Sequence, residues 1–204
     1  MTRNGRRGTL WPDERAGRTR LSLRGTTMGI TTRRGDGGST GLLYGPRVRK
    51  DHARIRALGA LDELNAWLGL VKARHPRPAV RATLHDCQEA LMTLMSEVAT
   101  PPQARGRLKR RLDAATVQRI EAHTACASGR AGDRGRTFAL PGTNELSALL
   151  DVARSVARRA ERDVVACERA EMTAPVGCCL NRLSDLLFLL AREAEKMPSP
   201  RARR

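Results

Sequence analysis

The chain has 204 residues and a formal net charge of +17, and this length is enough for one domain with a buried core. Apolar residues make up 40% of it but aromatic residues only 2%, so the core must consist of Leu, Ala, Val and Ile, which favours packed helices over a β-sandwich. The charge alone is compatible with nucleic acid, an acidic membrane or a polyanionic small molecule as a partner.

Much of this positive charge lies where no fold is expected. Residues 1–27 contribute +5 and residues 201–204 contribute +3, and Arg outnumbers Lys by 34 to 4, as a coding bias would produce. No basic segment is interleaved with aromatic residues, so we expect no nucleic-acid partner. No apolar run approaches the length that crosses a bilayer, so we expect no membrane partner.

The cysteines and histidines show no pattern typical of a metal site. The five cysteines include no CxxC pair, and the four histidines form no HExxH motif. We therefore expect reduced thiols, a cytoplasmic location and no protein metal site. The basic N-terminus lacks the apolar stretch of a secretory signal; a transit-like segment and a true start at Met28 remain alternatives.

Glycine divides the chain into two regions. Ten of the 18 glycines lie in residues 1–45, which predicts a disordered extension over residues 1–28 and then a glycine-rich loop. From residue 51 onward apolar side chains recur at helical spacing, and no strand-like alternation of useful length is present. We predict one helical domain over residues 29–196 and a disordered basic tail over residues 197–204.

Five helices are predicted in this domain, with N-caps at Asp51, Asp113 and Thr143 for the first, third and fourth. Proline opens or stops several of them. Short connections favour antiparallel neighbours, so the fold class is an all-α five-helix bundle. The helices are expected at about residues 51–75, 78–99, 114–127, 143–171 and 173–196, with residues 103–111 as a basic linker.

One face of the fourth predicted helix is rich in guanidinium groups. Arg154, Arg158 and Arg162 are four residues apart and Glu161 follows Arg158 by three, so on a helix they share a face. Like charges repel each other unless an anion lies among them, and the Arg fork matches phosphate oxygens. A polyphosphate site is the functional interpretation, and a solvated basic face is the alternative.

The segment TRRGDGGSTGLL, residues 32–43, can wrap backbone N–H groups and hydroxyls around phosphates, and Lys50 follows closely. It is not a Walker A loop, because it lacks GK[ST] and no strand is expected before it. A flexible linker is the alternative interpretation.

Three further positions have a functional and a structural interpretation. Asp62 lies near an apolar stripe, where a carboxylate wants a cation such as Arg154; an exposed carboxylate is the alternative. Asn181 can recognise ribose or adenine, or bond another helix. Phe138 precedes the fourth helix, where it could be a simple packing residue.

Seven segments carry a more specific signal: TRRGDGGSTGL (32–42), RVRKD (47–51), ALGALDELNAWLG (57–69), CQEALMTLMSEVATP (87–101), FALPGTNELSALLDVAR (138–154), RRAERDVV (158–165) and LNRLSDLLFLLAR (180–192). In this order and spacing they resemble the PduO-type ATP:cob(I)alamin adenosyltransferases. The resemblance runs from about Ile30 to Arg192, and RRAERDVV followed by NRLSDLLF is its most specific part.

This resemblance implies a fold, a reaction and an assembly. Members are five-helix bundles of ferritin-like topology that form homotrimers with active sites between subunits. They transfer the 5′-deoxyadenosyl group of ATP to the cobalt of cob(I)alamin, which forms adenosylcobalamin and releases triphosphate, with Mg²⁺ on the phosphates. A reductase and an adenosylcobalamin-dependent acceptor enzyme are candidate further partners.

The resemblance also implies roles for individual residues. Asp62 and Arg154 match a salt bridge across the subunit interface, and Phe138 matches the aromatic residue that closes over the lower face of cobalt and displaces its axial ligand. The residues implied in catalysis are Arg158, Phe138, Asp62 and Arg154. Those implied in ATP binding are Thr32, Arg33, Gly35, Asp36, Gly38, Thr40, Lys50, Arg158, Glu161 and Asn181.

One departure from the family pattern bears on the site. Asp151 stands where many members have His, and it lies close enough to Arg154 along the helix to compete with Asp62 for that arginine. No residue implied in phosphate binding or in closing over cobalt is missing, so we expect an active enzyme. A catalytically silent carrier or sensor of ATP or cobalamin with the same fold is the alternative.

Overall fold

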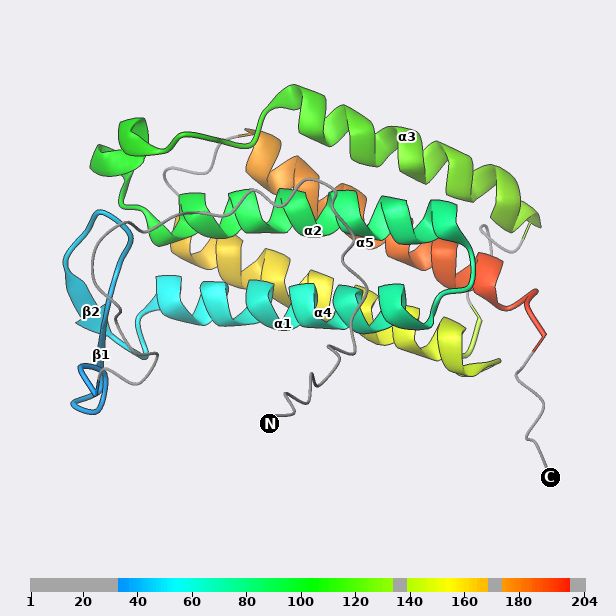
Figure 1. Ribbon diagram of the computed structural model, residues 1–204, viewed down its shortest axis with the longest axis horizontal. Coiled ribbons are helices and arrows are strands. Elements are labelled where there is room, and N and C mark those ends of the chain that lie inside the picture. The colour runs from blue at the N-terminus through cyan, green and yellow to red at the C-terminus, as the bar shows by residue number, and fades with distance from the viewer. Residues whose placement is uncertain (1–32, 134–138, 169–173, 199–204) are drawn as a thin grey trace, which may run out of the picture. The chain divides into compact units, whose positions relative to one another are not determined.

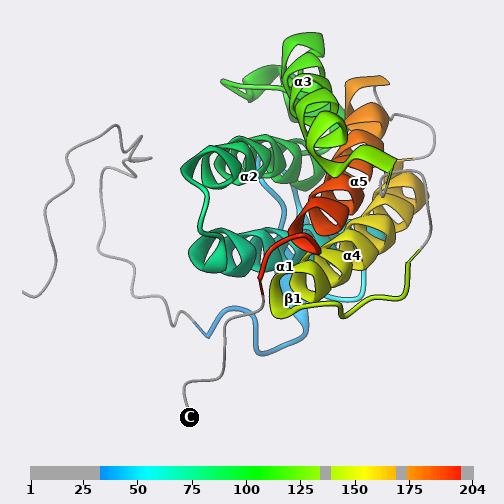
Figure 2. The same ribbon diagram turned by 90° about the vertical axis from the view of Figure 1, so that its right-hand side faces the viewer.

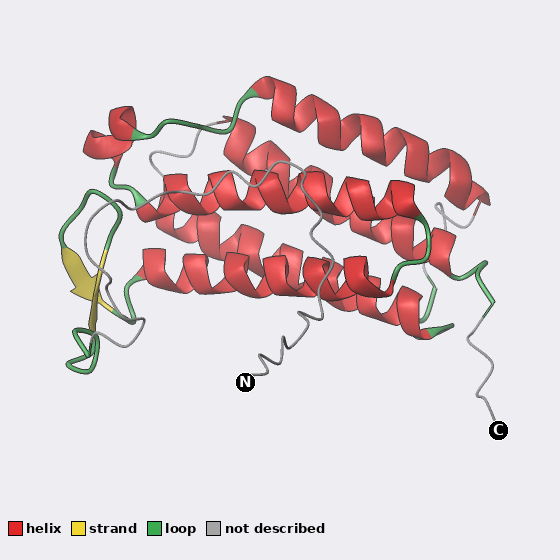
Figure 3. Ribbon diagram, in the orientation of Figure 1, coloured by secondary structure: helices red, strands yellow, loops and turns green. Residues whose placement is uncertain are grey.

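Helices dominate the residues that the computed structural model describes, which are 33–133, 139–168 and 174–198. The helices and strands described all belong to the unit of residues 34–204 (Figures 1 and 3). They are β1 (Ser39–Gly41), β2 (Arg47–Arg49), α1 (Ala53–Arg74), α2 (Pro78–Ala99), the 3₁₀ helix η1 (Pro102–Arg107), α3 (Ala114–Ala131), α4 (Glu145–Glu168) and α5 (Ala174–Ala194).

The helices within this unit pack side by side in a bundle (Figure 2). Helix α4 packs against both α1 and α5, α1 also packs against α2, and α3 covers α5. The all-α five-helix prediction is therefore confirmed. No helix among the described residues is long and apolar enough to cross a membrane.

Leucine and alanine fill the core, as the shortage of aromatic residues requires. The predicted inward positions Leu61, Leu64 and Leu68 of α1 are fully buried, and they belong to one apolar cluster with residues of every other α-helix. Small and branched aliphatic side chains together reach the packing density of a protein interior without aromatic rings. Val165 is 36% exposed, because the buried stripe of α4 ends at Val164.

The first helix does not begin where the sequence suggested. Its N-cap is His52, whose Nδ1 accepts a hydrogen bond from the Arg54 N–H at 3.2 Å, so the prediction of Asp51 is wrong. The Asp51 carboxylate is engaged by the guanidinium of Arg49 at 2.6 and 2.9 Å, a contact that lowers the pKa of Asp51. A carboxylate held by an arginine is no longer available to cap the helix.

The cap of α4 is also displaced by one residue from the prediction. Asn144, and not Thr143, accepts the Ser147 N–H at 2.9 Å. The amide of Asn144 donates to the carbonyl of Ala194 at 2.7 Å, so this cap also ties the start of α4 to the end of α5. The cap at Asp113 is confirmed by its 2.8 Å bond from the Thr116 N–H.

Three segments that were predicted as loop carry regular structure. The glycine-rich region contains the antiparallel hairpin β1–β2, and the basic linker contains η1. Helix α3 continues past residue 127 to Ala131, where Gly132 with φ of 62° ends it. The predicted end of α4 at Glu171 lies outside the described residues.

Candidate functional site

Two consecutive helices, α4 and α5, bring three of the predicted residues together. On α4, Nη1 of Arg158 lies 2.7 Å from Oε2 of Glu161, one turn later. The same nitrogen donates to Oδ1 of Asn181 on α5 at 3.4 Å. The predicted cluster of Arg158, Glu161 and Asn181 is therefore present in the fold, at the seam where α4 packs on α5.

This cluster has the groups that a nucleotide requires. The side chain of Arg158 is 48% exposed, so the guanidinium that Glu161 holds in place still faces solvent with free donor capacity. Arginine held in one orientation is a directed donor for phosphate oxygens, and Asn181 supplies an amide beside it. The α4–α5 face can thus bind an anionic ligand that also carries hydroxyl or amide groups.

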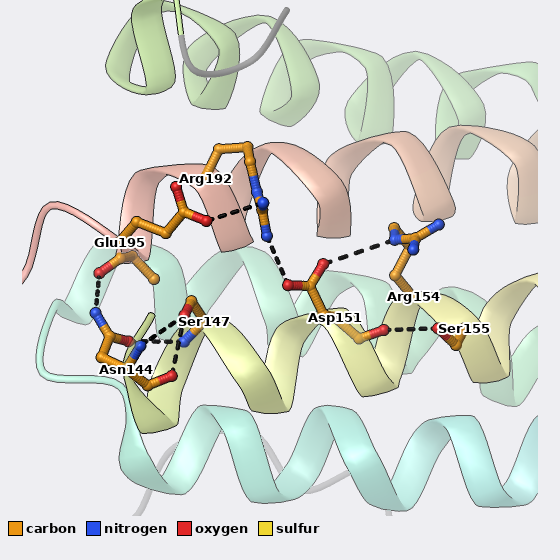
Figure 4. A network of polar contacts seen from close by, with 8 residues as sticks. Asn144, Ser147, Asp151, Arg154, Ser155, Arg192 and Glu195 are labelled. Atoms are coloured by element: carbon orange, nitrogen blue, oxygen red, sulfur yellow. Dashed lines mark hydrogen bonds and ion pairs between the residues drawn. The ribbon is translucent and has the colours of Figure 1, made fainter. Parts of the chain in front are cut away.

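Arg154 lies further along α4, in an environment that the sequence only partly anticipated. Its Nε lies 3.8 Å from Oδ1 of Asp151, an ion pair too long for a hydrogen bond (Figure 4). Asp62 is exposed on α1, and no ion pair joins it to Arg154 within the part of this chain that the structure describes. The predicted pairing between subunits stays a prediction, while Asp151 does approach Arg154 as expected.

A buried charge network adjoins Arg154 and was not predicted. The Arg192 guanidinium, 1% exposed, donates to Oδ2 of Asp151 at 2.6 Å and lies 2.8 Å from the carboxylate of Glu195 (Figure 4). The sequence signal for this network was weak, because an arginine near the end of an apolar helix usually extends to solvent. Asp151, the departure from the family pattern, is the residue that links the network to Arg154.

The glycine-rich loop is held from within by an arginine that sequence reasoning did not single out. Nη2 of Arg47 donates to the carbonyl of Arg34 at 2.6 Å and to the carbonyl and hydroxyl of Ser39 at 2.9 Å each. The backbone N–H of Lys50 donates to the carbonyl of Gly38 at 2.9 Å. These bonds close the loop before any ligand arrives, which lowers the entropic cost of ordering it around a ligand.

Several of the predicted phosphate-binding groups meet in this loop. A Cβ built on Gly35 would lie 3.2 Å from Nζ of Lys50, so the ammonium group lies next to the loop backbone. Gly38 has φ of 74°, a conformation that favours glycine, and Asp36 is exposed. Thr40 lies in β1 opposite Val48.

The remaining predicted residues are less informative. Arg33 is exposed with φ of 54°. Thr32 and Phe138 lie outside the described residues. No hydrogen bond or ion pair among residues 34–133, 139–168 and 174–198 joins the loop to Arg158.

Among the described residues, neither a metal cluster nor the cavity at the end of α1 marks the site. In the described ranges, no group of three or more His, Cys, Asp or Glu side chains could hold a metal ion. A cavity of about 580 Å³ lies where α1 ends and α4 begins, lined in part by Arg74, Asn144 and Leu149. Arg158 lies nine residues beyond the lining residue Leu149, about 13.5 Å further along α4 at 1.5 Å per residue, and it does not line this cavity.

The fold that carries the Arg158–Glu161–Asn181 cluster and the glycine-rich loop places the chain in the class of α-helical bundle proteins. Within that class, the chain belongs to the cobalamin adenosyltransferase family, whose model matches residues 30–194. The match covers the loop and all five α-helices.

Two relatives illustrate the similarity. The chain is 37% identical over 170 residues to a corrinoid adenosyltransferase of Citrobacter freundii. The aligned region covers 83% of this chain and 96% of that protein. It is 39% identical over 171 residues to the corrinoid adenosyltransferase PduO of the same organism, which covers 81% of this chain. The chain spans about half (49%) of the length of that second relative.

Solved structures agree with the family assignment. A variant PduO-type ATP:corrinoid adenosyltransferase from Lactobacillus reuteri, complexed with cobalamin and ATP, matches with a TM-score of 0.74 and 29% identity, covering 82% of this chain and 93% of that one. Another variant of that enzyme, complexed with ATP, matches with a TM-score of 0.72 and 29% identity over 82% of this chain and 94% of that one.

Proposed function

We propose that this protein is an ATP:corrinoid adenosyltransferase that converts cob(I)alamin and ATP into adenosylcobalamin and triphosphate. The observation that carries the proposal is the Arg158–Glu161–Asn181 cluster on a bundle of the cobalamin adenosyltransferase family. The corrinoid adenosyltransferase relatives support it, as does the solved PduO-type ATP:corrinoid adenosyltransferase complexed with cobalamin and ATP.

The reaction requires little covalent chemistry from the protein. The substrate cob(I)alamin supplies the electron pair that forms the cobalt–carbon bond at C5′ of ATP, the C5′–O bond breaks, and triphosphate leaves with the bonding electrons. The protein needs no Ser, Cys or His nucleophile, and it contributes alignment of the reacting atoms and stabilisation of the leaving charge.

Positive groups of the loop and of α4 would perform this stabilisation. Lys50 and the backbone N–H groups of residues 35–37 would hold the triphosphate, whereas the Gly38 N–H donates to the carbonyl of Gly35 at 3.1 Å. Thr32, Arg33 and Thr40 would add further contacts. Arg158 would meet charge that develops as the C5′–O bond breaks, because Glu161 already fixes its orientation. Asn181 would orient the nucleoside through its amide.

Magnesium fits this site only as a companion of the nucleotide. The exposed carboxylate of Asp36 is isolated from other acidic side chains in the loop, and the described residues offer no metal cage. Mg²⁺ would therefore be held mainly by phosphate oxygens and water, where it would neutralise part of the triphosphate charge.

A homotrimer would complete the site, with the loop of one copy facing the α4–α5 seam of the next. The exposure of Asp62 supports this arrangement, because the carboxylate is accessible to a neighbouring copy. Asp62 would pair with Arg154 of the neighbouring copy in competition with Asp151, and Phe138 would close over cobalt. A reductase and an acceptor enzyme for adenosylcobalamin would be the further partners.

A turnover experiment tests this function. Chemically reduced cobalamin and ATP are mixed with the protein without oxygen, and the loss of the cob(I)alamin spectrum and the release of triphosphate are followed together. Equal amounts of adenosylcobalamin and triphosphate are expected. ATP binding without either product would refute the transferase and leave the carrier or sensor as the function.

A further inference from the structure

The turn of the hairpin, residues 42–46, is seated on the junction between α2 and η1. The Leu43 N–H donates to the carbonyl of Ala99, the last residue of α2, at 2.9 Å. The ring of Tyr44 lies 4.3 Å from the guanidinium carbon of Arg107 in η1, a cation–π contact. Figure 1 shows the hairpin at the end of the bundle where α1 begins and α2 ends.

Gly45 makes the closest approach in this seat. A Cβ built on Gly45 would lie 2.6 Å from Cγ and 2.9 Å from Cδ of Pro101, and 3.0 Å from Cβ of Leu42. Separations below 3.0 Å are not tolerated between carbon atoms, and a proline ring cannot rotate away. A side chain at position 45 therefore forces the turn and Pro101 apart.

The hairpin would carry such a displacement to the glycine-rich loop. Three residue pairs join β1 to β2 in the register Ser39↔Arg49, Thr40↔Val48 and Gly41↔Arg47, with the turn at one end of the ladder and the loop at the other. A ladder of this length spans only about 10 Å at 3.4 Å per residue. The hydrogen bonds of Arg47 to the loop and the bond from the Lys50 N–H to the carbonyl of Gly38 connect the loop to the ladder, so the two move together.

We propose that Gly45 is a positioning residue for the triphosphate site, because its contact with Pro101 sets where the loop and Lys50 stand relative to the helical bundle. This inference rests on the proposed function, since it assigns the loop to ATP. Gly45 does not touch the nucleotide; it acts through the seat of the turn. The steric requirement is this close approach of the turn to Pro101, and Gly106 in η1 does not share it.

The variant Gly45→Ala tests the inference. We expect the KM for ATP to rise at least tenfold, while the KM for cob(I)alamin and the helical circular dichroism signal stay unchanged. Amide hydrogen exchange at Leu43 should become faster, because its bond to Ala99 is lost. Gly106→Ala is the matched control, since a Cβ at Gly106 meets no atom within 4 Å.

A second substitution separates positioning from a general loss of structure. Pro101→Ala removes the two ring carbons that a Cβ at position 45 would strike, so the double variant Gly45→Ala/Pro101→Ala should recover most of the ATP KM and the slow exchange of Leu43. An unchanged KM for ATP in Gly45→Ala, or no recovery in the double variant, would overturn the inference. If the unmodified protein does not turn over, the proposed function fails, and calorimetric ATP affinity of the same variants then decides the positioning role.

Discussion

The guanidinium of Arg192 donates to the carboxylate of Asp151 across 2.6 Å in the interior of the bundle, with side chains that are 1% and 8% exposed (Figure 4). This pair joins α5 to α4 next to the site residue Arg154. A buried ion pair adds little net stability compared with apolar packing, but the removal of one partner leaves a desolvated charge. The pair should therefore be sensitive to substitution although it lies outside the reacting centre.

Substitution of Asp151 by Asn should destabilise the fold strongly. The change keeps the shape of the side chain and removes the negative charge, so Arg192 retains only Glu195 as a counter-ion. We expect the free energy of unfolding in urea to fall by about 3 kcal/mol, the lower end of values for broken buried pairs.

The control for Asp151→Asn is Glu63→Gln. Glu63 pairs with Arg159 between α1 and α4, but both side chains are 46% exposed. Exposed pairs contribute about 0–1 kcal/mol, so this variant should stay close to the unmodified protein. Equal losses in the two variants would contradict the assigned importance of burial.

Removal of the Arg158 guanidinium should weaken ATP binding. Charged hydrogen bonds contribute roughly 1.5–3 kcal/mol each, so Arg158→Ala should lower ATP affinity by roughly 10- to 150-fold in calorimetry and slow turnover. Arg159→Ala is the matched control, because Arg159 is the next residue on α4 yet points to Glu63 of α1. The same affinity loss in both variants would mean a nonspecific charge effect and not a site.

Acid should destabilise the fold through His75. This residue is 3% exposed at the end of α1. Burial lowers its pKa and is the largest cause; the charge of Glu193 acts in the opposite direction, and the charge of Arg77 lowers the pKa further. The unfolded chain therefore binds a proton more readily than the folded one. The contribution of neutral His75 is present above the unfolded pKa of about 6.5 and is lost as pH falls from that value toward the lower folded pKa.

The variant His75→Asn isolates this effect. An Asn carbonyl can accept the Arg77 N–H that Nδ1 of His75 accepts at 3.2 Å, but it does not titrate. Urea unfolding at pH 7.5 and pH 5.5 should show a larger loss of stability in the unmodified protein than in the variant. Parallel losses would show that other groups govern the acid response.

The cysteines should differ sharply in reactivity. Cys87 and Cys179 are fully buried, and burial raises the pKa of both thiols, that of Cys179 to about 12. Cys126 on α3 is exposed. At pH 8, iodoacetamide should alkylate Cys126 in the folded protein and Cys87 and Cys179 only in denaturant, as mass spectrometry of peptides would reveal. Labelling of Cys87 at the rate of Cys126 would contradict the helical packing.

Local rules were sufficient where neighbours in sequence decide the structure. Prolines bracket α2, and its predicted bounds of Pro78 and Ala99 are those observed. The Arg158–Glu161 pair follows from helical spacing alone, because residues three apart always meet on a helix. The hairpin was missed because its strands have only three residues each, too few to show an alternation of apolar and polar side chains, and β1 ends in Gly41.

The sequence by itself determined the helices, their apolar faces and the family to which the chain belongs, because these depend on spacings within a few turns and on ordered motifs. Only the tertiary structure decided that Asp151 meets Arg192 and that Gly45 fits against Pro101. Such contacts join residues far apart in the chain, and a side chain's partner there depends on how the helices pack, which no local pattern encodes.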